Sequence, residues 1–435
     1  MAVIVVGAGL AGCEAAWQLA QKNIAVTLYE MKPEKFTPAH HYAGFAELVC
    51  SNSLKASRVD SAAGLLKEEM RLFGSLVMDS AAMSSVAAGG ALAVDRKKFS
   101  DYITDQIRSH PNIRVISEEL SSIPDGYCII ATGPLTSNSL ANEIQTFLHA
   151  ESLSFFDAAA PIVTAESIDT SIAFAASRYG RGEDDYLNCP MDKSEYEAFH
   201  NALIHAQQAP LNEFDRPDFR VYEGCMPIEV LAKRGTDSIR FGPLKPVGLR
   251  DPRTGHRPWA VVQLRRENAQ GSLYNLVGFQ TNLKFPEQKR VFSMIPGLQN
   301  AEFVRYGVMH RNTFLDSPRF LDASFQFKDK PGLFFAGQMT GVEGYTESAA
   351  SGILAGYNMA RIVEGKEPII LPRTTMIGAL AGYISDSSIV NFQPMGANLG
   401  ILPPLAEPIR DKRMRAAKVA ERSLTALREL LQKEN

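Results

Sequence analysis

The sequence begins with AVIVVGAGLAGCEAAWQLA (residues 2–20), whose pattern is the strongest structural signal in the chain. Residues 2–6 are apolar and mostly β-branched, which is typical of a strand buried in a parallel sheet. Three glycines follow as G-x-G-x-x-G, and small and apolar residues then recur at helical spacing up to Lys22. A second apolar run, residues 25–29, ends at Glu30. This order of strand, glycine loop, helix, strand and acid predicts a Rossmann-type dinucleotide site.

Each glycine of the loop has its own role in such a site. Gly7 allows the tight turn, Gly9 lets backbone N–H groups approach a pyrophosphate, and Gly12 lets the helix pack on the strand. The phosphates would bind at the positive end of the helix, while Glu30 accepts hydrogen bonds from ribose hydroxyls. The expected cofactor-binding residues of the loop are Gly7, Ala8, Gly9, Leu10, Ala11 and Gly12.

The loop alone fits either NAD or FAD, and two later segments distinguish them. Residues 127–134, YCIIATGP, and residues 332–345, GLFFAGQMTGVEGY, each join a buried strand to glycines, and a helix is expected over 346–363. These segments resemble flavoproteins with two dinucleotide-binding domains, in which the last segment runs along the ribitol and the flavin. Many of those proteins carry Asp after the final strand glycine, where this chain has Gln338. The cofactor residues expected here are Gly133, Gly337, Gln338, Gly341 and Gly344.

The flavin-type segments lie at both ends of the chain, so we expect an α/β fold with an insertion. We predict a Rossmann-like FAD-binding domain in two parts, 1–145 and 328–435, the second with a C-terminal helix. The inserted α+β domain, 146–327, contains alternating segments that indicate antiparallel strands. Its loop-rich stretch 231–257 carries seven basic and two acidic residues, which suits an RNA-facing surface, although such arginines often only pair with nearby acids. The candidate RNA-binding residues are Arg250, Arg253 and Arg257.

Composition excludes several classes of protein. With 45% hydrophobic and 21% charged residues over 435 positions, the chain is not disordered. A net charge of -3 excludes a uniformly basic nucleic-acid coat. No apolar run is long enough for a transmembrane span, and the start does not have the pattern of a signal peptide. Five widely spaced cysteines indicate no metal cluster and fit a reducing cytosol. We therefore expect a cytoplasmic enzyme without metal or membrane attachment.

Two of the cysteines have unusual neighbours. Cys50 precedes Ser51, Asn52 and Ser53, which suit a loop beside a flavin, and Cys225 lies in the exposed-elbow pattern YEGCMPIEV. From the residues alone, a catalytic and a structural role are equally supported for both. Cys128 lies inside an apolar strand and is expected in the core, whereas the role of Cys189 stays open.

Several segments together resemble the family of folate- and FAD-dependent tRNA (uracil-5-)-methyltransferases. The likeness spans nearly the whole chain and includes the glycine loop, CSNSLK, EGCMPIE, HRNTF and AGQMTGVEGYTESAASGILAG. The related GidA/MnmG flavoproteins share the flavin motifs but have a large helical C-terminal region. Here only about 70 residues follow the flavin helix.

The resemblance implies C5-methylation of a T-loop uridine of tRNA, at position 54. The implied one-carbon donor is 5,10-methylenetetrahydrofolate, reduced FAD is the reductant, and NADH or NADPH re-reduces the flavin. A cysteine thiolate adds to C6 of the flipped uracil, and a base removes the C5 proton. We assign Cys225 as nucleophile and Cys50 as base, with the reverse order left open. His310 is a tentative folate residue, and a loop histidine without a ligand is equally supported.

Three rival functions use the same motifs. The chemistry could act on a ribosomal RNA uridine, or the chain could be a GidA/MnmG-like wobble-uridine enzyme or a small-molecule flavin oxidoreductase. The expected partners are tRNA, folate and NAD(P)H, and a homodimer is a candidate assembly.

Overall fold

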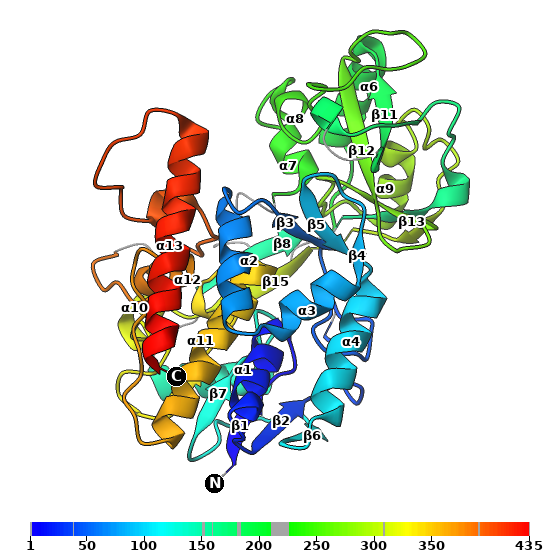
Figure 1. Cartoon of the computed structure of the whole chain (residues 1–435). Helices are drawn as coiled ribbons and strands as arrows, with labels where there is room; N and C mark the ends of the chain where they lie inside the picture. Colours follow the sequence, from blue (N-terminus) through cyan, green and yellow to red (C-terminus); the bar gives the residue numbers. More distant parts are fainter. Residues whose placement is uncertain are drawn as a thin grey trace.

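The computed structural model describes residues 2–37, 39–149, 153–158, 160–180, 184–209, 226–307, 309–389 and 392–434. Within these ranges the apolar side chains form two cores. One takes residues from Val3 to Leu148 and from Phe314 to Leu427, and the other takes residues from Ala160 to Ala301. In Figure 1, the part of the chain that forms the second core lies above the part that forms the first core. The C-terminal helix lies on the left of the view, away from the second core.

A five-stranded parallel sheet organises the first core, as the sequence predicts. Its order is β16-β7-β1-β2-β6, and every neighbouring pair is parallel. The strands are β1 (Val3–Val6), β2 (Val26–Glu30), β6 (Ile113–Ser117), β7 (Cys128–Ile130) and β16 (Leu333–Phe335). Because parallel strands end at one edge, the glycine loop, Glu30 and the loops after β7 and β16 meet there.

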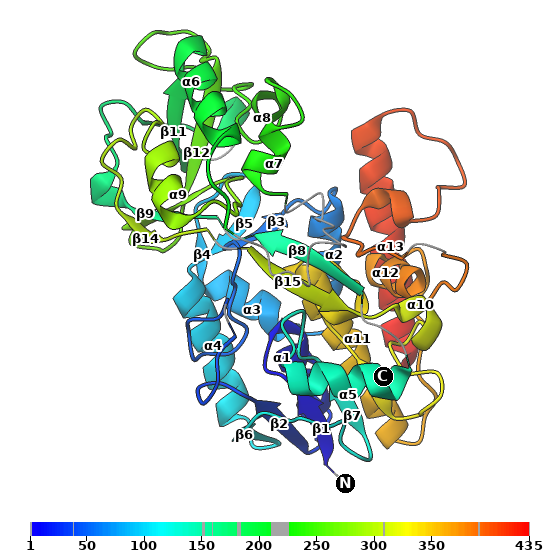
Figure 2. The same cartoon turned by 180° about the vertical axis from the view of Figure 1, so that it is seen from behind.

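Two helices pack side by side against this sheet, α1 (Leu10–Gln21) and α11 (Tyr345–Val363). A Cβ added at Gly352 would lie 2.7 Å from Ala11 Cα, and one at Gly356 would lie 2.7 Å from Ala15 Cα. Only glycine therefore permits this close approach of the two helices. Helix α5 (Asn138–Leu148) covers the opposite face (Figure 2).

Buried carboxylates fix the surrounding helices. Glu14 accepts the Val77 N–H at 2.9 Å and thereby caps α3. Glu69 accepts the Met376 and Ile377 N–H groups at 2.6 and 2.8 Å and also binds the Ser423 hydroxyl, so it joins α2 to α12 and α13. The helices are α2 (Ala62–Leu72), α3 (Leu76–Met83), α4 (Arg96–Ser109), α12 (Met376–Ile384) and α13 (Lys412–Glu434). The expected C-terminal helix is α13, which begins at Lys412.

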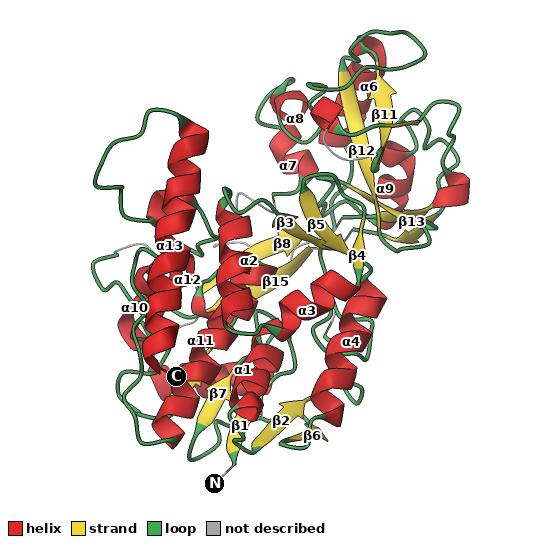
Figure 3. Cartoon of the chain, viewed as in Figure 1, coloured by secondary structure: helices red, strands yellow, loops and turns green. Residues whose placement is uncertain are grey.

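The inserted part is entered by β8 (Leu153–Ala158) and left by β15 (Met309–Phe314), which pair antiparallel. Between them lies a six-stranded sheet of order β10-β11-β12-β13-β9-β14 (Figure 3). Its strands are β9 (Ile162–Thr164), β10 (Phe174–Ala175), β11 (Tyr186–Met191), β12 (Ala260–Arg266), β13 (Leu273–Leu276) and β14 (Phe303–Arg305). The predicted antiparallel pair is confirmed in β12 and β13. The helices here are α6 (Lys193–Ile204), α7 (Ile228–Ala232), α8 (Ser238–Phe241) and α9 (Phe285–Phe292), and α10 (Ser317–Phe320) follows β15.

The two parts meet at the loop that carries Cys50. Arg265 of β12 donates to Asn52 Oδ1 at 2.9 Å and to Ser51 Oγ at 2.8 Å. Glu267 Oε2 lies 2.8 Å from Nε of Arg96, the first residue of α4. This loop runs on into β3 (Ser53–Ala56), which forms a small sheet with β4 (Ser85–Val86) and β5 (Ala91–Val94). The inserted sheet is therefore attached directly to the segment next to Cys50.

Candidate active site

The glycine loop opens into a cavity at the carboxyl edge of the parallel sheet. A Cβ at Gly7 would lie 2.8 Å from Ala131 O, and one at Gly12 would lie 1.8 Å from Gly7 O, so both positions need glycine for packing. A Cβ at Gly9 would meet nothing within 4 Å. Gly9 precedes α1, whose first turn has no side-chain cap. The loop thus presents backbone N–H groups to open space, which suits an anion.

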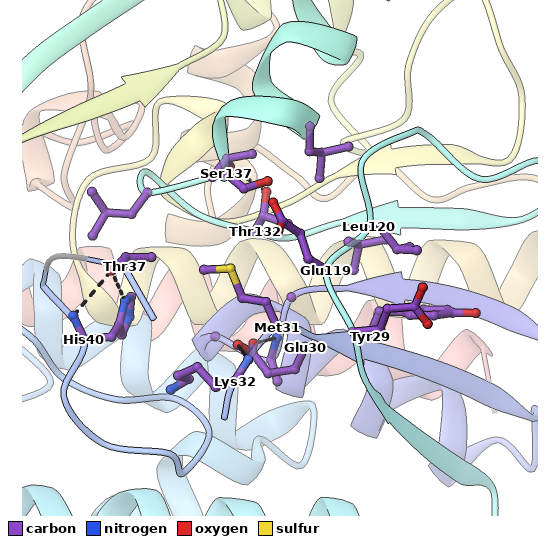
Figure 4. A pocket seen from close by; sticks show the side chains of 18 of the residues that line it. Tyr29, Glu30, Met31, Lys32, Thr37, His40, Glu119, Leu120, Thr132 and Ser137 are labelled. Atoms are coloured by element: carbon purple, nitrogen blue, oxygen red, sulfur yellow. Dashed lines mark hydrogen bonds between the residues drawn. The ribbon is translucent and has the colours of Figure 1, made fainter. Parts of the chain in front are cut away.

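The first cavity is open to solvent, has about 690 Å³ of empty space including its mouth, and extends from the glycine loop to the end of β2. Glu30 is buried and accepts the Ala8 N–H at 2.7 Å and the Lys32 N–H at 3.0 Å. Figure 4 shows Glu30 and Lys32 on one side, with Thr132 and Ser137 across the cavity. A carboxylate at this place can accept hydrogen bonds from ribose hydroxyls, because each oxygen has more than one lone pair.

A second cavity of about 710 Å³ adjoins the first. Gly133, Gly337, Gln338, Cys50 and Tyr345 line it. Both cavities share the lining residues Gly9, His40, Glu47, Thr132 and Leu135. The open space is therefore continuous from Glu30 past the glycine loop to Cys50, a shape that suits an extended dinucleotide.

The structure separates the expected cofactor residues into two groups. One group lines the cavities and comprises Gly7, Ala8, Gly9, Leu10, Ala11, Glu30, Gly133, Gly337 and Gln338. The other group supports the backbone instead. Gly12 packs α1, a Cβ at Gly341 would lie 2.4 Å from the Phe392 ring, and one at Gly344 would lie 2.2 Å from Glu347 Oε2. Gln338 donates to Glu343 Oε2 at 2.7 Å, which fixes its amide.

Three residues that line the cavities are not predicted by the sequence motifs. Glu47 and His40 line both cavities, and Tyr345 lines the second. Glu47 Oε1 accepts the His41 N–H at 2.9 Å, whereas its buried Oε2 has no hydrogen-bond partner among the described residues. No local motif marks Glu47. The feature of the sequence that comes nearest to indicating such an acid is Gln338, because many flavoproteins carry an acid at that position.

Cys50 lies in the second cavity on a loop that is held from three directions. The Tyr345 hydroxyl lies 2.7 Å from the Cys50 amide nitrogen and 3.3 Å from its Sγ. Arg96 donates to the Leu48 and Val49 carbonyls at 2.7 and 3.3 Å, and Arg305 donates to the Val49 carbonyl as well. Arginines next to a cysteine favour its thiolate form.

Three other cysteines are excluded as reactive thiolates by burial. Cys13, Cys128 and Cys189 are fully buried. Cys128 lies in the core of the parallel sheet, as predicted, and Cys189 lies in the core of the inserted part. Burial raises the pKa of the Cys128 thiol and of the Cys189 thiol to about 12. Burial also raises the pKa of Cys13 well above its usual value, and Glu30 adds to the effect.

Cys225 lies outside the described residues. The residues that flank its segment are attached to one place in the inserted part. The Ala209 N–H donates to the Asn282 carbonyl at 2.7 Å, and the Ile228 N–H donates to the Gln280 carbonyl at 2.8 Å. His310 lies in β15, where it pairs with Asp157, but its side chain lies outside the described part of the chain.

The three arginines expected to bind RNA lie on the surface of the inserted part. Arg253 forms a pair with Asp251, with Nη2 and Oδ2 2.7 Å apart. Within the described residues, Arg250 contacts the Gly255 carbonyl at 3.4 Å, and Arg257 is exposed. Arg253 thus fits the alternative that an arginine in this loop only pairs with a nearby acid.

Two further properties concern the described ranges as a whole. No cluster of three or more His, Cys, Asp or Glu residues with the geometry for a metal ion occurs in them. None of their helices combines the length and the apolar character needed to cross a membrane.

Comparison with known proteins identifies the family. The family model described as "Glucose inhibited division protein A" matches residues 2–367. A protein of Acetivibrio thermocellus named "Methylenetetrahydrofolate--tRNA-(uracil-5-)-methyltransferase TrmFO" is 59% identical over 99% of this chain and 98% of its own length. A protein of the same name from Ligilactobacillus salivarius is 59% identical over 98% of this chain and 97% of its own length.

Among solved structures, that of Aquifex aeolicus GidA superposes with a TM-score of 0.70 at 17% identity. The match covers 98% of this chain and 73% of the GidA chain, and it supports the same flavoprotein fold. The chain therefore belongs to the glucose-inhibited division protein A family and, within it, to the TrmFO group, which the sequence motifs predicted.

Proposed function

We propose that this chain transfers the one-carbon unit of 5,10-methylenetetrahydrofolate to C5 of a uridine in tRNA, at position 54 of the T loop, with FAD as its bound cofactor. The printed name of its full-length relatives states the folate donor and the uracil-5 position in tRNA. The structural observation that carries the proposal is the presence of Cys50 in the cavity that continues from the glycine loop.

The chain's own residues fit FAD. The uncapped first turn of α1 and the open side of Gly9 would hold the pyrophosphate, and Glu30 would hold the adenosine ribose. The Oε2 of Glu47 lies 3.7 Å from Lys32 Nζ and accepts no hydrogen bond from the described residues, so it would accept one from a ribityl hydroxyl. When bound, FAD supplies the reducing electrons that convert the transferred one-carbon unit into a methyl group.

The remaining steps belong to two cysteines. The Cys225 thiolate adds to C6 of the uracil, which makes C5 nucleophilic enough to attack the methylene group. Cys50 then takes the proton from C5, and tetrahydrofolate leaves the methylene carbon. The Cys225 thiolate leaves as the methylene is reduced to a methyl group and the C5–C6 double bond reforms. Arg96 and Arg305 support this role, because both interact electrostatically with Cys50.

The same proposal names the partners. NADH or NADPH re-reduces the flavin, and His310 lies against the folate. Arg250, Arg257 and to a lesser extent Arg253 meet the RNA phosphates, and the enzyme works in the cytoplasm, as a homodimer, on its tRNA substrate. The exposed position of Arg250 and Arg257 supports the phosphate contacts.

One assay tests the proposal. The purified protein is incubated with tRNA, NADPH and methylene-labelled folate, without S-adenosylmethionine. We expect yellow protein and label in 5-methyluridine at position 54 of the tRNA. Label in ribosomal RNA alone would show that the substrate is a ribosomal RNA uridine. Flavin turnover without any labelled RNA would favour a small-molecule oxidoreductase. Cys50→Ser is the matched inactive variant, because it keeps the side-chain size and removes the thiol.

A further inference from the structure

The phenol of Tyr345 is hydrogen-bonded to the Cys50 thiol. Tyr345 is the first residue of α11, and the two residues lie 295 positions apart in the chain. Its hydroxyl oxygen lies 2.7 Å from the Cys50 amide nitrogen and 3.2 Å from the Ser51 amide nitrogen. The Cys50 Sγ lies 3.3 Å away. Three atoms of the Cys50 loop thus surround one hydroxyl.

The direction of the hydroxyl proton follows from the number of partners. A phenol has one proton to donate and accepts through its oxygen lone pairs. Backbone amides can only donate, so the bonds from Cys50 and Ser51 use the acceptor capacity of the oxygen. The proton of the hydroxyl is left to point at the sulfur. The Tyr345 hydroxyl therefore donates to Cys50 Sγ.

We infer that Tyr345 is the positioning residue of Cys50: its hydroxyl fixes the loop backbone and donates the hydrogen bond that stabilises the Cys50 thiolate. This inference rests on the proposed function, in which Cys50 accepts the C5 proton. A hydrogen bond to a charged sulfur is stronger than one to a neutral thiol, so the donor favours the proton-accepting form. When Cys50 takes up the proton, Tyr345 keeps its own proton and no further group is consumed.

The charged groups around Cys50 and Tyr345 favour a Tyr345 hydroxyl that keeps its proton. Arg96 of α4 and Arg305 of β14 interact electrostatically with both Cys50 and Tyr345, and Glu267 pairs with Arg96. His40 and Glu47 line the same cavity. Burial, followed by the neighbouring Cys50, raises the pKa of Tyr345 well above its usual value. The phenol consequently stays protonated over the pH range in which a cysteine ionises.

The test measures the rate at which iodoacetamide alkylates Cys50 as a function of pH, read by mass spectrometry of the Cys50 peptide. It uses the purified flavin-loaded protein and needs neither folate nor RNA, so its outcome is independent of methyl transfer. The fully buried Cys13, Cys128 and Cys189 do not compete for the reagent. Tyr345→Phe is compared with Tyr383→Phe, which also loses one hydroxyl hydrogen bond, at 2.8 Å to the Gln393 carbonyl.

We expect the midpoint of the profile to move to higher pH by about one unit or more in Tyr345→Phe, because a hydrogen bond to a charged group is lost. The midpoint should not move in Tyr383→Phe. A change in the limiting rate at high pH with an unmoved midpoint would mean that Tyr345 only shapes the loop, and it would overturn the inference.

A second measurement keeps the native fold, in case Tyr345→Phe does not fold. Protein made with 3-fluorotyrosine contains a more acidic phenol, which is a better donor. The Cys50 midpoint should then move to lower pH, and a midpoint equal to that of the unlabelled protein would contradict a donating Tyr345.

Discussion

The Glu47 carboxylate stands 3.7 Å from Lys32 Nζ, yet its buried Oε2 has no hydrogen-bond partner among the described residues. Lys32 Nζ instead donates to the Tyr42 and Gly44 carbonyls, at 3.1 and 2.6 Å. Buried polar atoms are normally hydrogen-bonded, so we expect a ligand hydroxyl to bind this oxygen at the junction of the two cavities.

We expect Glu47→Ala to weaken FAD binding by about tenfold, because a charge-assisted hydrogen bond to the cofactor is lost. A fluorescence titration of the flavin-free protein with FAD measures this. Glu34→Ala, in an exposed part of the same segment, is the control and should bind FAD normally. Tighter binding by Glu47→Ala would contradict the assignment, since it would mean that the carboxylate repels the pyrophosphate.

The two glycines Gly9 and Gly12 should respond differently to substitution. Gly9→Val should fold but lose FAD, because its side chain projects into the open space of the pyrophosphate site. Gly12→Ala should destabilise the protein itself, since its Cβ would lie 1.8 Å from Gly7 O. Circular dichroism and flavin absorbance separate the two effects. Normal flavin content in Gly9→Val would place the pyrophosphate elsewhere.

How much of this site the sequence could predict depends on the distance between the residues along the chain. Gly7, Gly9 and Glu30 form a local strand–loop–helix–strand unit, so their spacing alone indicated their place at the sheet edge. Glu47 and Tyr345 carry no comparable pattern. Tyr345 meets Cys50 only because α11 packs against α1 through Gly352 and Gly356, a tertiary contact that no single-sequence periodicity encodes.

The fold class followed from buried strands that end in glycine-rich turns, and the inserted sheet from alternation in β12 and β13. The limits of the domains, the order of the two cysteines and the RNA contacts stay predictions. Arg253 shows why charge alone is a weak guide, because its pairing with Asp251 is decided by loop geometry and not by composition.

The buried Glu69 should make stability depend on pH. Burial raises the pKa of the Glu69 carboxyl from 4.5 to about 7, so the folded protein holds a proton there that the unfolded chain releases. The stabilisation of the folded protein by the protonated Glu69 carboxyl is therefore fully present below about pH 4.5 and is lost as the pH rises through about 7. The corresponding change in the free energy of unfolding is about 3 kcal/mol.

Urea unfolding at pH 4.5 and pH 7.5 measures this change. Glu69→Gln, which cannot ionise, should lose this part of the pH dependence, whereas the neighbouring variant Glu68→Gln, at a half-buried position, should keep it. Identical pH profiles for the wild type and Glu69→Gln would show that Glu69 is ionised in the folded state.

The basic loop should bind RNA through its exposed cations Arg250 and Arg257. Arg250→Ala with Arg257→Ala should weaken tRNA binding and reduce its salt dependence, because phosphate contacts release counterions. Arg253→Ala should have a smaller effect, since Arg253 already pairs with Asp251. Filter binding at several salt concentrations tests this, with flavin content as the folding control. An unchanged tRNA affinity in the double variant would show that tRNA binds at another surface of the protein.

The assignment of Cys225 as nucleophile and Cys50 as base is tested most directly with tRNA that carries 5-fluorouridine at position 54. Fluorine leaves C6 open to attack but gives the base no proton to remove, so a covalent adduct accumulates and appears as a shifted band on a denaturing gel. We predict that Cys225→Ala forms no adduct and that Cys50→Ala forms one although it no longer methylates tRNA. An adduct with Cys225→Ala and none with Cys50→Ala would reverse the assignment, and adducts with both variants would contradict cysteine nucleophilicity in this enzyme.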